Sequence, residues 1–481
     1  MRKTYTYGII IWLAGLLTSC SKDFLDLKPD QSAETGKAIR DLPGLRSATN
    51  GMYSLMQSPN YYGRTVPLLP DLRSDNSFIS VINTNRYRNQ DQYIVTANDV
   101  YTTDSWNILY SVVANANMVI ARGPQVTLLP SSTDSVEAKQ LVAEAYAVRG
   151  LAFFDLSRMY AQPYNFTSNA SHMGVPIVTI TNVDSVQSPS RSTMKDTYTQ
   201  IISDLRTAIH KFEESGSTAF SSGRINVYSA KALLSRVLLY KEDWAGAAAL
   251  ANDVINSGKY SLLERDKLVS SFKMTGNGET IFEIINTPVD NAGTDGLGYL
   301  FNQDGYGDVL ATNNVYNIYA AGDVRRNFLK KSKRAGNGGE NPANVITKYS
   351  DVAAFSEGIK VIRLAELYLI RAEAQAHLGK APEAQADLNV VAQRADHDAL
   401  PVTVTGQELL DAVQLERRKE LAFEGHRLFD LIRTKQSFVK YLASNKIIPV
   451  AWPSTKVILP IPQRELDANP NIRNQQNEGY K

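Results

Sequence analysis

Apolar residues recur at every third or fourth position along several long stretches of the chain, which is the spacing of one buried face of an α-helix. The pattern runs through 136–160, at Leu141, Ala145, Val148, Ala152, Leu156 and Met159. The alanines and Gly150 carry little side chain, so we expect a second helix to approach this one closely. The same spacing predicts helices over 104–122 and 194–212.

Three further segments predict helix pairs in which a short turn joins two helices. They are 226–260, 361–395 and a last pair that begins with 406–435. The first two resemble tetratricopeptide-type pairs, because small and large apolar residues alternate on both sides of a turn. In the second pair, Gly379 and Pro382 stop one helix and start the next. The intervals between the pairs are irregular, so the pattern excludes a regular solenoid.

Long loop-rich stretches separate these helices. They cover 57–103, where tyrosines lie among Asn, Asp and Pro, and 274–358, which is rich in Gly and Asn. Loops of this length inside a compact protein are usually functional or disordered. The sequence therefore predicts a mainly α-helical fold, with tetratricopeptide-like helix pairs as the scaffold, long loop-rich insertions and few short strands.

The N-terminus has the layout of a secretory signal. Two basic residues precede an apolar run at 9–17 that is too short to span a bilayer. The run ends in Leu17-Thr18-Ser19-Cys20, which resembles the bacterial lipobox, and Cys20 is the only cysteine. We therefore interpret 1–19 as a lipoprotein signal peptide and Cys20 as the lipid-modified first residue of the mature chain, carrying palmitate-type acyl chains. The alternative is an ordinary signal peptide that happens to end in cysteine.

The residues after Cys20 predict where the anchored protein faces. Ser21-Lys22-Asp23 resembles the surface-export signal of some Gram-negative lipoproteins. Each lipid chain contributes about 0.8 kcal/mol per buried CH₂, and several chains make a stable anchor. We expect 20–35 to form a lipidated tether and the protein to face the cell exterior from the outer membrane.

The amino-acid composition limits the classes of molecule that the protein is expected to bind. Of the 481 residues, 43% are hydrophobic and 21% charged, which is typical of a globular protein. Without Arg2 and Lys3 of the signal, 49 basic residues balance 49 acidic ones. A neutral chain has no electrostatic reason to bind nucleic acid. A single cysteine excludes internal disulfides and multi-cysteine zinc sites.

Segments spread over the whole chain together resemble the SusD/RagB family of outer-membrane nutrient-binding lipoproteins. The resemblance runs from Cys20 to Lys481, behind the lipobox. In chain order, the matching segments are 143–164, 174–177, 191 with 198–205, 223–240, 279–284, 323–325, 362–380, 415–433 and 458–480. One departure is Ala392, which stands where the family often has an arginine and removes one local salt bridge at most.

The resemblance implies an organisation and a function. It implies a SusD-like N-terminal helical region over 36–273 and a RagB/SusD C-terminal region over 274–481, packed together as one body. It further implies a non-enzymatic surface lipoprotein, without cofactor or metal. Such a protein captures oligosaccharides, or for some members peptides, and delivers them to a SusC-like TonB-dependent transporter.

A series of opposite charges occupies helical spacings near the C-terminus. It comprises Glu416, Arg417, Glu420, Glu424, Arg427, Asp430 and Arg433. These spacings allow ion pairs along the helix, and Arg363 or Arg371 could pair with them from the neighbouring helix pair. Because the charges neutralise one another, we interpret the series as structural rather than catalytic.

Motifs that carry chemistry are few. The sequence lacks a P-loop, a zinc-protease motif and a serine-hydrolase elbow. His397 between Asp396 and Asp398 could hold a metal ion, although a solvated turn is the simpler interpretation. Acids in 290–308 could supply the carboxylate pair of a glycoside hydrolase, but acids in such loops are usually turn formers. A surface glycan hydrolase and a protein-binding adaptor without glycan affinity remain the alternatives.

We place the ligand site where the first insertion, 61–106, meets the second, 286–320. Both carry aromatic residues among Asn, Asp and Arg, and loops on a rigid scaffold are where binding residues concentrate. The candidates are Tyr299, Phe301 and Tyr306 for stacking on sugar rings, and Asp75, Asn76 and Asn302 for contacts with hydroxyls. Trp106 could belong to the site, but we expect it in a helix core.

Overall fold

The computed structural model describes residues 39–128, 132–180 and 188–480. The helices are α2 (Leu42–Gln57), α3 (Thr65–Leu72), α4 (Arg88–Asp91), α5 (Val100–Arg122), α6 (Ser132–Tyr160), α7 (Met194–Ser215), α8 (Val227–Tyr240), α9 (Trp244–Ile255), α10 (Arg265–Leu268), α11 (Leu297–Phe301), α12 (Asn313–Asn317), α13 (Leu364–His377), α14 (Ala381–Ala395), α15 (Gly406–Leu421), α16 (Arg427–Arg433) and α17 (Gln463–Ala468). The strands are β1 (Ser77–Ile79), β2 (Met173–Pro176), β3 (Arg191–Thr193), β4 (Thr280–Ile284), β5 (Val309–Ala311), β6 (Leu329–Ser332), β7 (Ala343–Ile346), β8 (Ile359–Arg363), β9 (Phe438–Tyr441) and β10 (Ile447–Val450). These elements confirm the mainly α-helical fold with few short strands.

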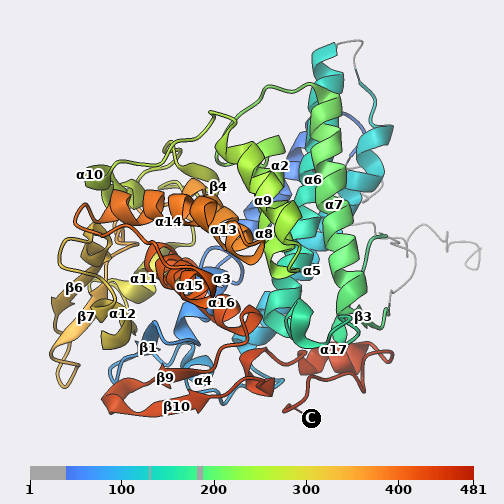
Figure 1. Cartoon of the computed structure of the whole chain (residues 1–481). Helices are drawn as coiled ribbons and strands as arrows, with labels where there is room; N and C mark the ends of the chain where they lie inside the picture. Colours follow the sequence, from blue (N-terminus) through green and yellow to red (C-terminus); the bar gives the residue numbers. More distant parts are fainter. Residues whose placement is uncertain (1–38, 129–131, 181–187, 481) are drawn as a thin grey trace, which may run out of the picture.

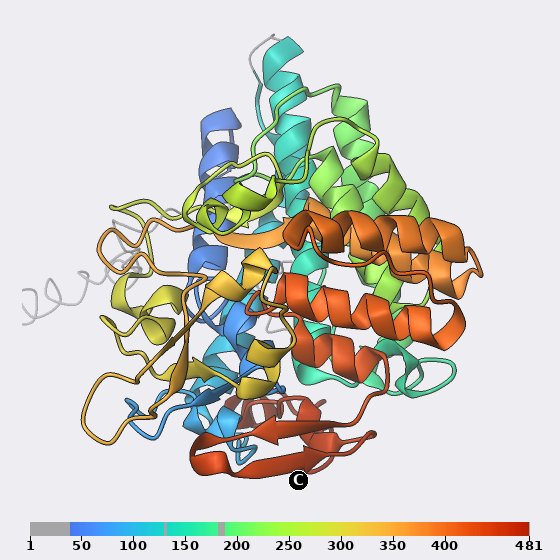
Figure 2. The same cartoon turned by 60° about the vertical axis from the view of Figure 1, so that its left-hand side comes forward.

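The predicted helix pairs are present as α8 with α9, α13 with α14, and α15 with α16. Figures 1 and 2 show α5 to α9 standing side by side, with α13 to α16 beside them and the strand-containing insertions beyond. The turn between α13 and α14 contains Gly379 at φ +74°, a left-handed conformation that glycine adopts without strain. The prediction that one helix ends and the next begins around Gly379 and Pro382 is confirmed.

Helices α6 and α7 pack closely, as the small residues of α6 predict. A Cβ atom placed on Gly150 would lie 3.1 Å from the Leu205 side chain and 3.3 Å from the Ile201 carbonyl of α7. A Cβ at 150 would therefore require the α7 neighbours to shift by a few tenths of an ångström. Buried Arg149 crosses the same interface and pairs with Asp204 at 2.6 Å.

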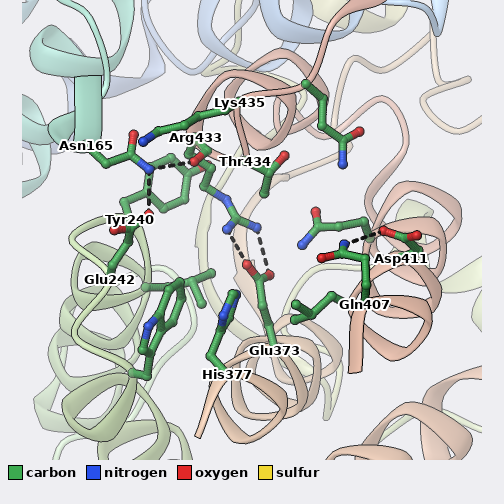
Figure 3. Close-up of a pocket in the computed structure, with 15 residues that line it drawn as sticks. Asn165, Tyr240, Glu242, Glu373, His377, Gln407, Asp411, Arg433, Thr434 and Lys435 are labelled. Atoms are coloured by element: carbon green, nitrogen blue, oxygen red, sulfur yellow. Dashed lines mark hydrogen bonds and ion pairs between the residues drawn. The ribbon is translucent and has the colours of Figure 1, made fainter. Parts of the chain in front are cut away.

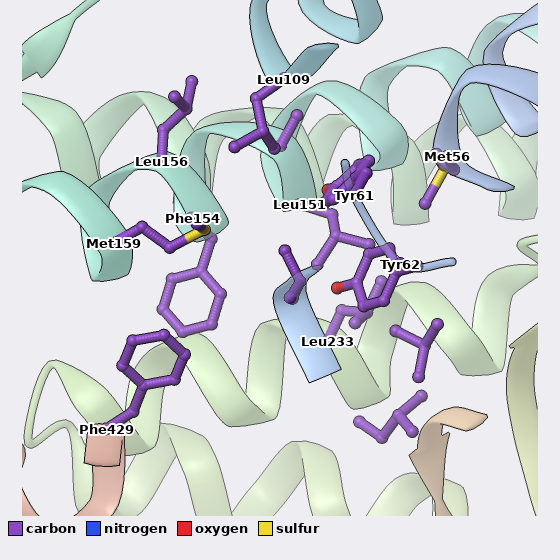
Figure 4. Packing of buried hydrophobic residues seen from close by; sticks show 14 of the residues in the cluster. Met56, Tyr61, Tyr62, Leu109, Leu151, Phe154, Leu156, Met159, Leu233 and Phe429 are labelled. Carbon is purple, nitrogen blue, oxygen red and sulfur yellow. The ribbon is translucent and has the colours of Figure 1, made fainter. Parts of the chain in front are cut away.

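The largest hydrophobic cluster extends from α2 to the C-terminal segment and includes a helix that the sequence pattern did not predict. Every residue of α3 is buried, although α3 lies in the first loop-rich stretch. Figure 4 shows Tyr61 and Tyr62, just before α3, among core side chains of α6 and α8. Their hydroxyls donate to Asp155 at 2.8 and 2.9 Å. The tyrosines therefore anchor the first insertion in the core.

A buried ion network holds the C-terminal helices to β8 and α13. Arg363 pairs with Glu279, Glu420 and Glu424 at 2.6, 3.0 and 2.7 Å. Arg394, the arginine that remains beside Ala392, pairs with Glu279 and Glu420. The structural interpretation of the charge series and the partnership with Arg363 are confirmed.

Ion pairs within the series are present, because Asp430 pairs with both Arg417 and Arg433, and further partners lie outside it. Arg371 does not join the network and instead pairs with Asp387 on α14 at 2.7 Å. Arg433 reaches Glu373 of α13, and Arg427 reaches Asp75 in the first insertion. The charges therefore connect helices with one another and with an insertion.

Several predictions fall on the N-terminal residues or on boundaries. The signal peptide at 1–19, Cys20 and the tether at 20–35 precede the described residues, so they stay predictions. The boundary between 36–273 and 274–481 also stays a prediction, although one hydrophobic cluster contains residues from both regions. None of the described helices is both long enough and apolar enough to cross a lipid bilayer.

Candidate functional site

The two long insertions meet through a pair of antiparallel strands. Strand β1 of the first insertion pairs with β5 of the second, with Phe78 opposite Leu310. Just beyond the strands, the Ser80 amide donates to the Asp308 carbonyl at 2.8 Å. The segments 80–87 and 302–308 therefore lie side by side, which is the juxtaposition that the sequence analysis placed at the ligand site.

Partly exposed aromatic rings and a guanidinium gather at this junction, and we call Arg86, Tyr299, Tyr306 and Phe355 the aromatic–arginine face. The Arg86 guanidinium lies 3.9 Å from the centroid of the Tyr306 ring. The rings of Tyr299 and Tyr306 meet edge to face, 4.7 Å apart, and the Phe355 ring lies 6.0 Å from Tyr299. The hollow between Tyr299 and Phe355 holds only about 30 Å³, so the rings form an open surface rather than a cavity.

Phe355 is held in place by a loop that the sequence analysis did not single out. Its backbone is left-handed, at φ +54°, which costs free energy in a non-glycine residue. Asp351 fixes the turn by accepting hydrogen bonds from the Ser356, Ala354 and Ala353 amides. Burial opposes ionisation of Asp351, but these hydrogen bonds outweigh it and lower its pKa to about 2. No local sequence motif identifies this loop, because it is brought next to Tyr299 only when the chain folds.

Arg334 joins the two insertions beneath the face. Its side chain is buried and donates to the Ile82 carbonyl at 3.2 Å and to the Tyr306 carbonyl at 2.6 Å. Asp308 adds a second link, because its carboxylate accepts hydrogen bonds from the amide and the hydroxyl of Thr84. Burial raises the pKa of Asp308, and the bonds from Thr84 offset part of that rise. Both side chains serve to position the segments that carry the rings.

Two of the six predicted ligand residues lie on the face. Tyr299 and Tyr306 are partly exposed there. Asn302 lies in the turn between them, where its Nδ2 donates to the Ser350 carbonyl and its Oδ1 accepts from the Asp304 amide. In the structure, Asn302 thus shapes the loop that carries the two rings.

The structure places the other three predicted ligand residues in the interior. Phe301 is 1% exposed and packs against Tyr349 and Phe423, so neither face of its ring is open to a sugar. Asn76 is fully buried, with its Nδ2 donating to Asp71 and its Oδ1 accepting from Arg418.

Asp75 is also buried, with 8% of its surface exposed, and forms an ion pair with Arg427 at 2.8 Å. The prediction of hydroxyl contacts for Asp75 and Asn76 needs correction, because arginines of α15 and α16 already use both side chains. Trp106 is 2% exposed in α5, as expected of a helix core.

The residues considered for metal or acid–base chemistry do not converge on the face. Within the described ranges, no group of three or more His, Cys, Asp or Glu side chains is placed to hold a metal ion. Asp396 beside His397 instead accepts from the Asp398 amide within its own turn. Asp295 pairs with Arg64 at 3.2 Å, which further ties the second insertion to the first.

Comparison with known proteins agrees with this architecture. Residues 344–480 match a family model described as the SusD family, and 23–239 match one described as "Starch-binding associating with outer membrane". A solved SusD superfamily protein from Bacteroides vulgatus is 30% identical, with a TM-score of 0.82, over 92% of this chain and 100% of that one. The chain belongs to the SusD family.

Other SusD-family relatives carry names that mention sugars. A solved structure from Bacteroides vulgatus, titled a putative sugar binding protein, is 30% identical with a TM-score of 0.80 and covers 92% of this chain and 100% of its own. The starch-binding protein SusD of Bacteroides thetaiotaomicron is 35% identical over 127 residues, which are 26% of this chain and 22% of that protein. The description of the second matching model also associates its family with the outer membrane.

Proposed function

We propose that this SusD-family protein binds oligosaccharides at the aromatic–arginine face. The observation that carries the proposal is the cluster of partly exposed Tyr299, Tyr306 and Phe355 rings beside the Arg86 guanidinium. Aromatic faces stack on the apolar faces of sugar rings, and a guanidinium donates hydrogen bonds to hydroxyls. The names of the sugar-binding and starch-binding relatives support the same ligand class.

The open shape of the face suggests a moderate affinity. A wet, shallow surface excludes little water, so we expect dissociation constants between about 1 μM and 1 mM, or roughly −8 to −4 kcal/mol. The surroundings of Arg86 also supply rigidity, because Arg334 and Asp308 hold both loops before any ligand arrives. A preorganised site loses less conformational entropy on binding.

Titration calorimetry tests the proposal, with maltooligosaccharides as the first probe and oligosaccharides of other linkages next. Tyr306→Ala and Tyr299→Ala should each weaken binding about fivefold, because losing one stacking ring costs on the order of 1 kcal/mol. Phe220→Ala is the matched control, since this ring is 50% exposed outside the face. If both face variants bind like the wild type while remaining folded, the glycan site lies elsewhere.

We further propose a lipid-anchored carrier that passes its ligand to a SusC-like TonB-dependent transporter at the outer membrane. The lipobox-like segment and the family membership support this proposal. Cys20→Ala should release the protein from membranes, and a tagged wild-type protein should recover the transporter in mild detergent. A mutant that fractionates like the wild type, or a lipoprotein recovered alone, would count against it.

Binding without turnover completes the proposal. In the described residues, Asp308 and Asp295 are engaged with Thr84 and Arg64 in positioning the loops. Pure protein incubated with a glycan that it binds should release no reducing ends over hours. Sustained release, abolished by a single Asp or Glu change within 290–308, would instead establish the hydrolase alternative.

A further inference from the structure

A pocket of about 210 Å³ lies on the helical scaffold, outside the aromatic–arginine face (Figure 3). The ends of α8, α13 and α16 surround it together with the first turns of α15. It contains no residue of the two insertions. The volume is below the roughly 300–1,000 Å³ of pockets that enclose drug-sized ligands, and corresponds to about seven waters at ~30 Å³ each. The pocket therefore has room for one small ring.

Neutral amides supply much of its polar wall. Gln407 and Gln414 line it from α15, and Gln436 lines it from the segment after α16. In the described residues, the side chains of Gln414 and Gln436 make no hydrogen bond within the protein, whereas Gln407 donates to Asp411 at 2.8 Å. An amide both donates and accepts, as a sugar hydroxyl does. Gln414 is half-buried and Gln436 exposed, so both amides can exchange bound water for the hydroxyls of a ligand.

A pair of stacked aromatic rings also lines the pocket. The His377 imidazole stacks on the Trp244 indole with centroids 3.9 Å apart and an angle of 11° between planes. Burial lowers the pKa of His377, which keeps the ring neutral at neutral pH. Flat rings of this kind suit the apolar face of a pyranose.

One pair of opposite charges is neutralised within the pocket wall. Glu373 forms a buried pair with Arg433 through two hydrogen bonds (Figure 3). Glu242 accepts a hydrogen bond from the Asn165 amide at 2.6 Å. Glu242, Asp411 and Lys435 are exposed wall residues with no ion pair among the described residues, so their charges stay hydrated and are of mixed sign.

Two buried polar atoms in the wall lack a partner. Among the described residues, neither the Tyr240 hydroxyl nor Asn165 Oδ1 has a hydrogen bond, although both atoms are shielded from solvent. Unsatisfied buried polar atoms cost free energy and call for an explanation. Glu242 and Lys435, both in the wall, also adopt left-handed backbone conformations, at φ +65° and +56°. Each follows the end of a helix, where a left-handed residue commonly caps the last turn.

We infer that this pocket binds a single neutral pyranose ring, independently of the glycan face. The convergence of Gln414, Gln436 and the His377–Trp244 stack carries the inference. The ring could be a free hexose or the terminal unit of an oligosaccharide, since both present the same hydroxyls. The inference goes beyond the proposed function, because it adds a second sugar site on the scaffold.

Ligand-observed saturation-transfer NMR tests the inference on the full chain, with glucose, galactose and mannose as probes. At least one hexose should bind saturably, in the millimolar range. Gln414→Leu and Gln436→Leu should each weaken binding about fivefold, the effect of one lost hydrogen bond. Gln385→Leu on α14, a half-buried glutamine outside the pocket, is the matched control and should change nothing. Gln436 lies outside any helix or strand, so its variant keeps the test valid if Gln414→Leu unfolds.

Two further comparisons complete the test. Tyr306→Ala should leave hexose binding unchanged, which separates the pocket from the glycan face. Maltose binding with the same dependence on Gln436 indicates a chain-end ligand, whereas binding of glucose alone indicates a free hexose. The inference is overturned if no neutral hexose binds, if only glucosamine or glucuronate binds, or if both glutamine variants bind like the wild type.

Discussion

Arg363 in the buried ion network and Arg86 on the aromatic–arginine face illustrate two uses of the same side chain. Arg363 is 4% exposed and satisfied by three glutamates. Arg86 is partly exposed and lies over the single ring of Tyr306. A buried charge must be paired on every side because it has lost its water, whereas a surface charge keeps water and can exchange it for a ligand. An arginine whose charge is fully paired therefore belongs to the scaffold, whereas an arginine that is only partly paired lies on a surface that is available for binding.

The largest expected effect comes from breaking the network. Arg363→Met should lower the free energy of unfolding by about 3–5 kcal/mol, because it leaves Glu279, Glu420 and Glu424 buried with fewer partners. Urea unfolding measures the change. Arg46→Met is the matched control, since Arg46 and Glu137 form an exposed pair, and it should leave the unfolding midpoint nearly unchanged. Equal effects from the two variants would remove the distinction between buried and exposed arginines.

A second variant tests which aromatic rings belong to the core and which belong to the aromatic–arginine face. Phe301→Ala should lower the free energy of unfolding by about 3–5 kcal/mol, because the ring fills a closed space. Tyr299→Ala, only two positions away, should cost clearly less stability, since its ring is partly exposed. Denaturant unfolding and glycan titration of both variants check this. A stable Phe301→Ala protein that no longer binds glycan would return Phe301 to the site.

Buried His426, at the start of α16, predicts a dependence of stability on pH. Burial lowers the pKa of His426 to about 4 from its usual 6.5, with Arg236 and Arg417 opposing protonation and Glu366 and Asp430 favouring it. The unfolded chain therefore binds a proton below pH 6.5 that the folded chain does not. Through this group, stability should fall by on the order of 3 kcal/mol as the pH drops from 6.5 to 4. Between pH 6.5 and 4, the free energy of unfolding should fall more steeply with decreasing pH in the wild type than in His426→Gln. An equal pH dependence in the two proteins would contradict the lowered pKa of His426.

The smallest expected effect concerns the face itself. A double-mutant cycle with Arg86→Ala and Tyr306→Ala, read as glycan affinity, should give a coupling energy of about 0.5–1 kcal/mol, the size of a partly exposed cation–π contact. Calorimetry on the wild type, both single variants and the double variant supplies the four values. A coupling of zero would mean that Arg86 and Tyr306 act on the ligand separately.

The helix pairs were predictable because their signal is local. Gly379 and Pro382 end one helix and start the next within a few residues, and the apolar spacing of 136–160 repeats along the chain. Helix α3 was not predictable in this way. It is buried on all sides and contains Pro67 and Pro70, so it has neither a polar face nor a helical composition. Its conformation depends on packing with distant segments.

The contact between the two insertions was predictable, whereas the ligand site placed there stays a prediction. The meeting of the two insertions followed from composition, and β1 and β5 confirm it. Asp75 and Asn76 failed as ligand residues because their partners, Arg427 and Arg418, lie more than 300 positions away and leave no trace in the local sequence. Phe355 joins the face from a third loop for the same reason.

The pairing of β1 with β5 has a consequence for how the protein is made. Thr312 and Asp75, joined by a hydrogen bond at 2.8 Å, are 237 residues apart in the sequence. A chain that emerges from its N-terminus therefore exposes β1 long before the partner strand exists, and contacts of such long range slow folding. During synthesis, the edge of β1 is open to other chains. A factor that shields this edge would protect the nascent protein from aggregation more effectively than one that assists the helix pairs, which close locally.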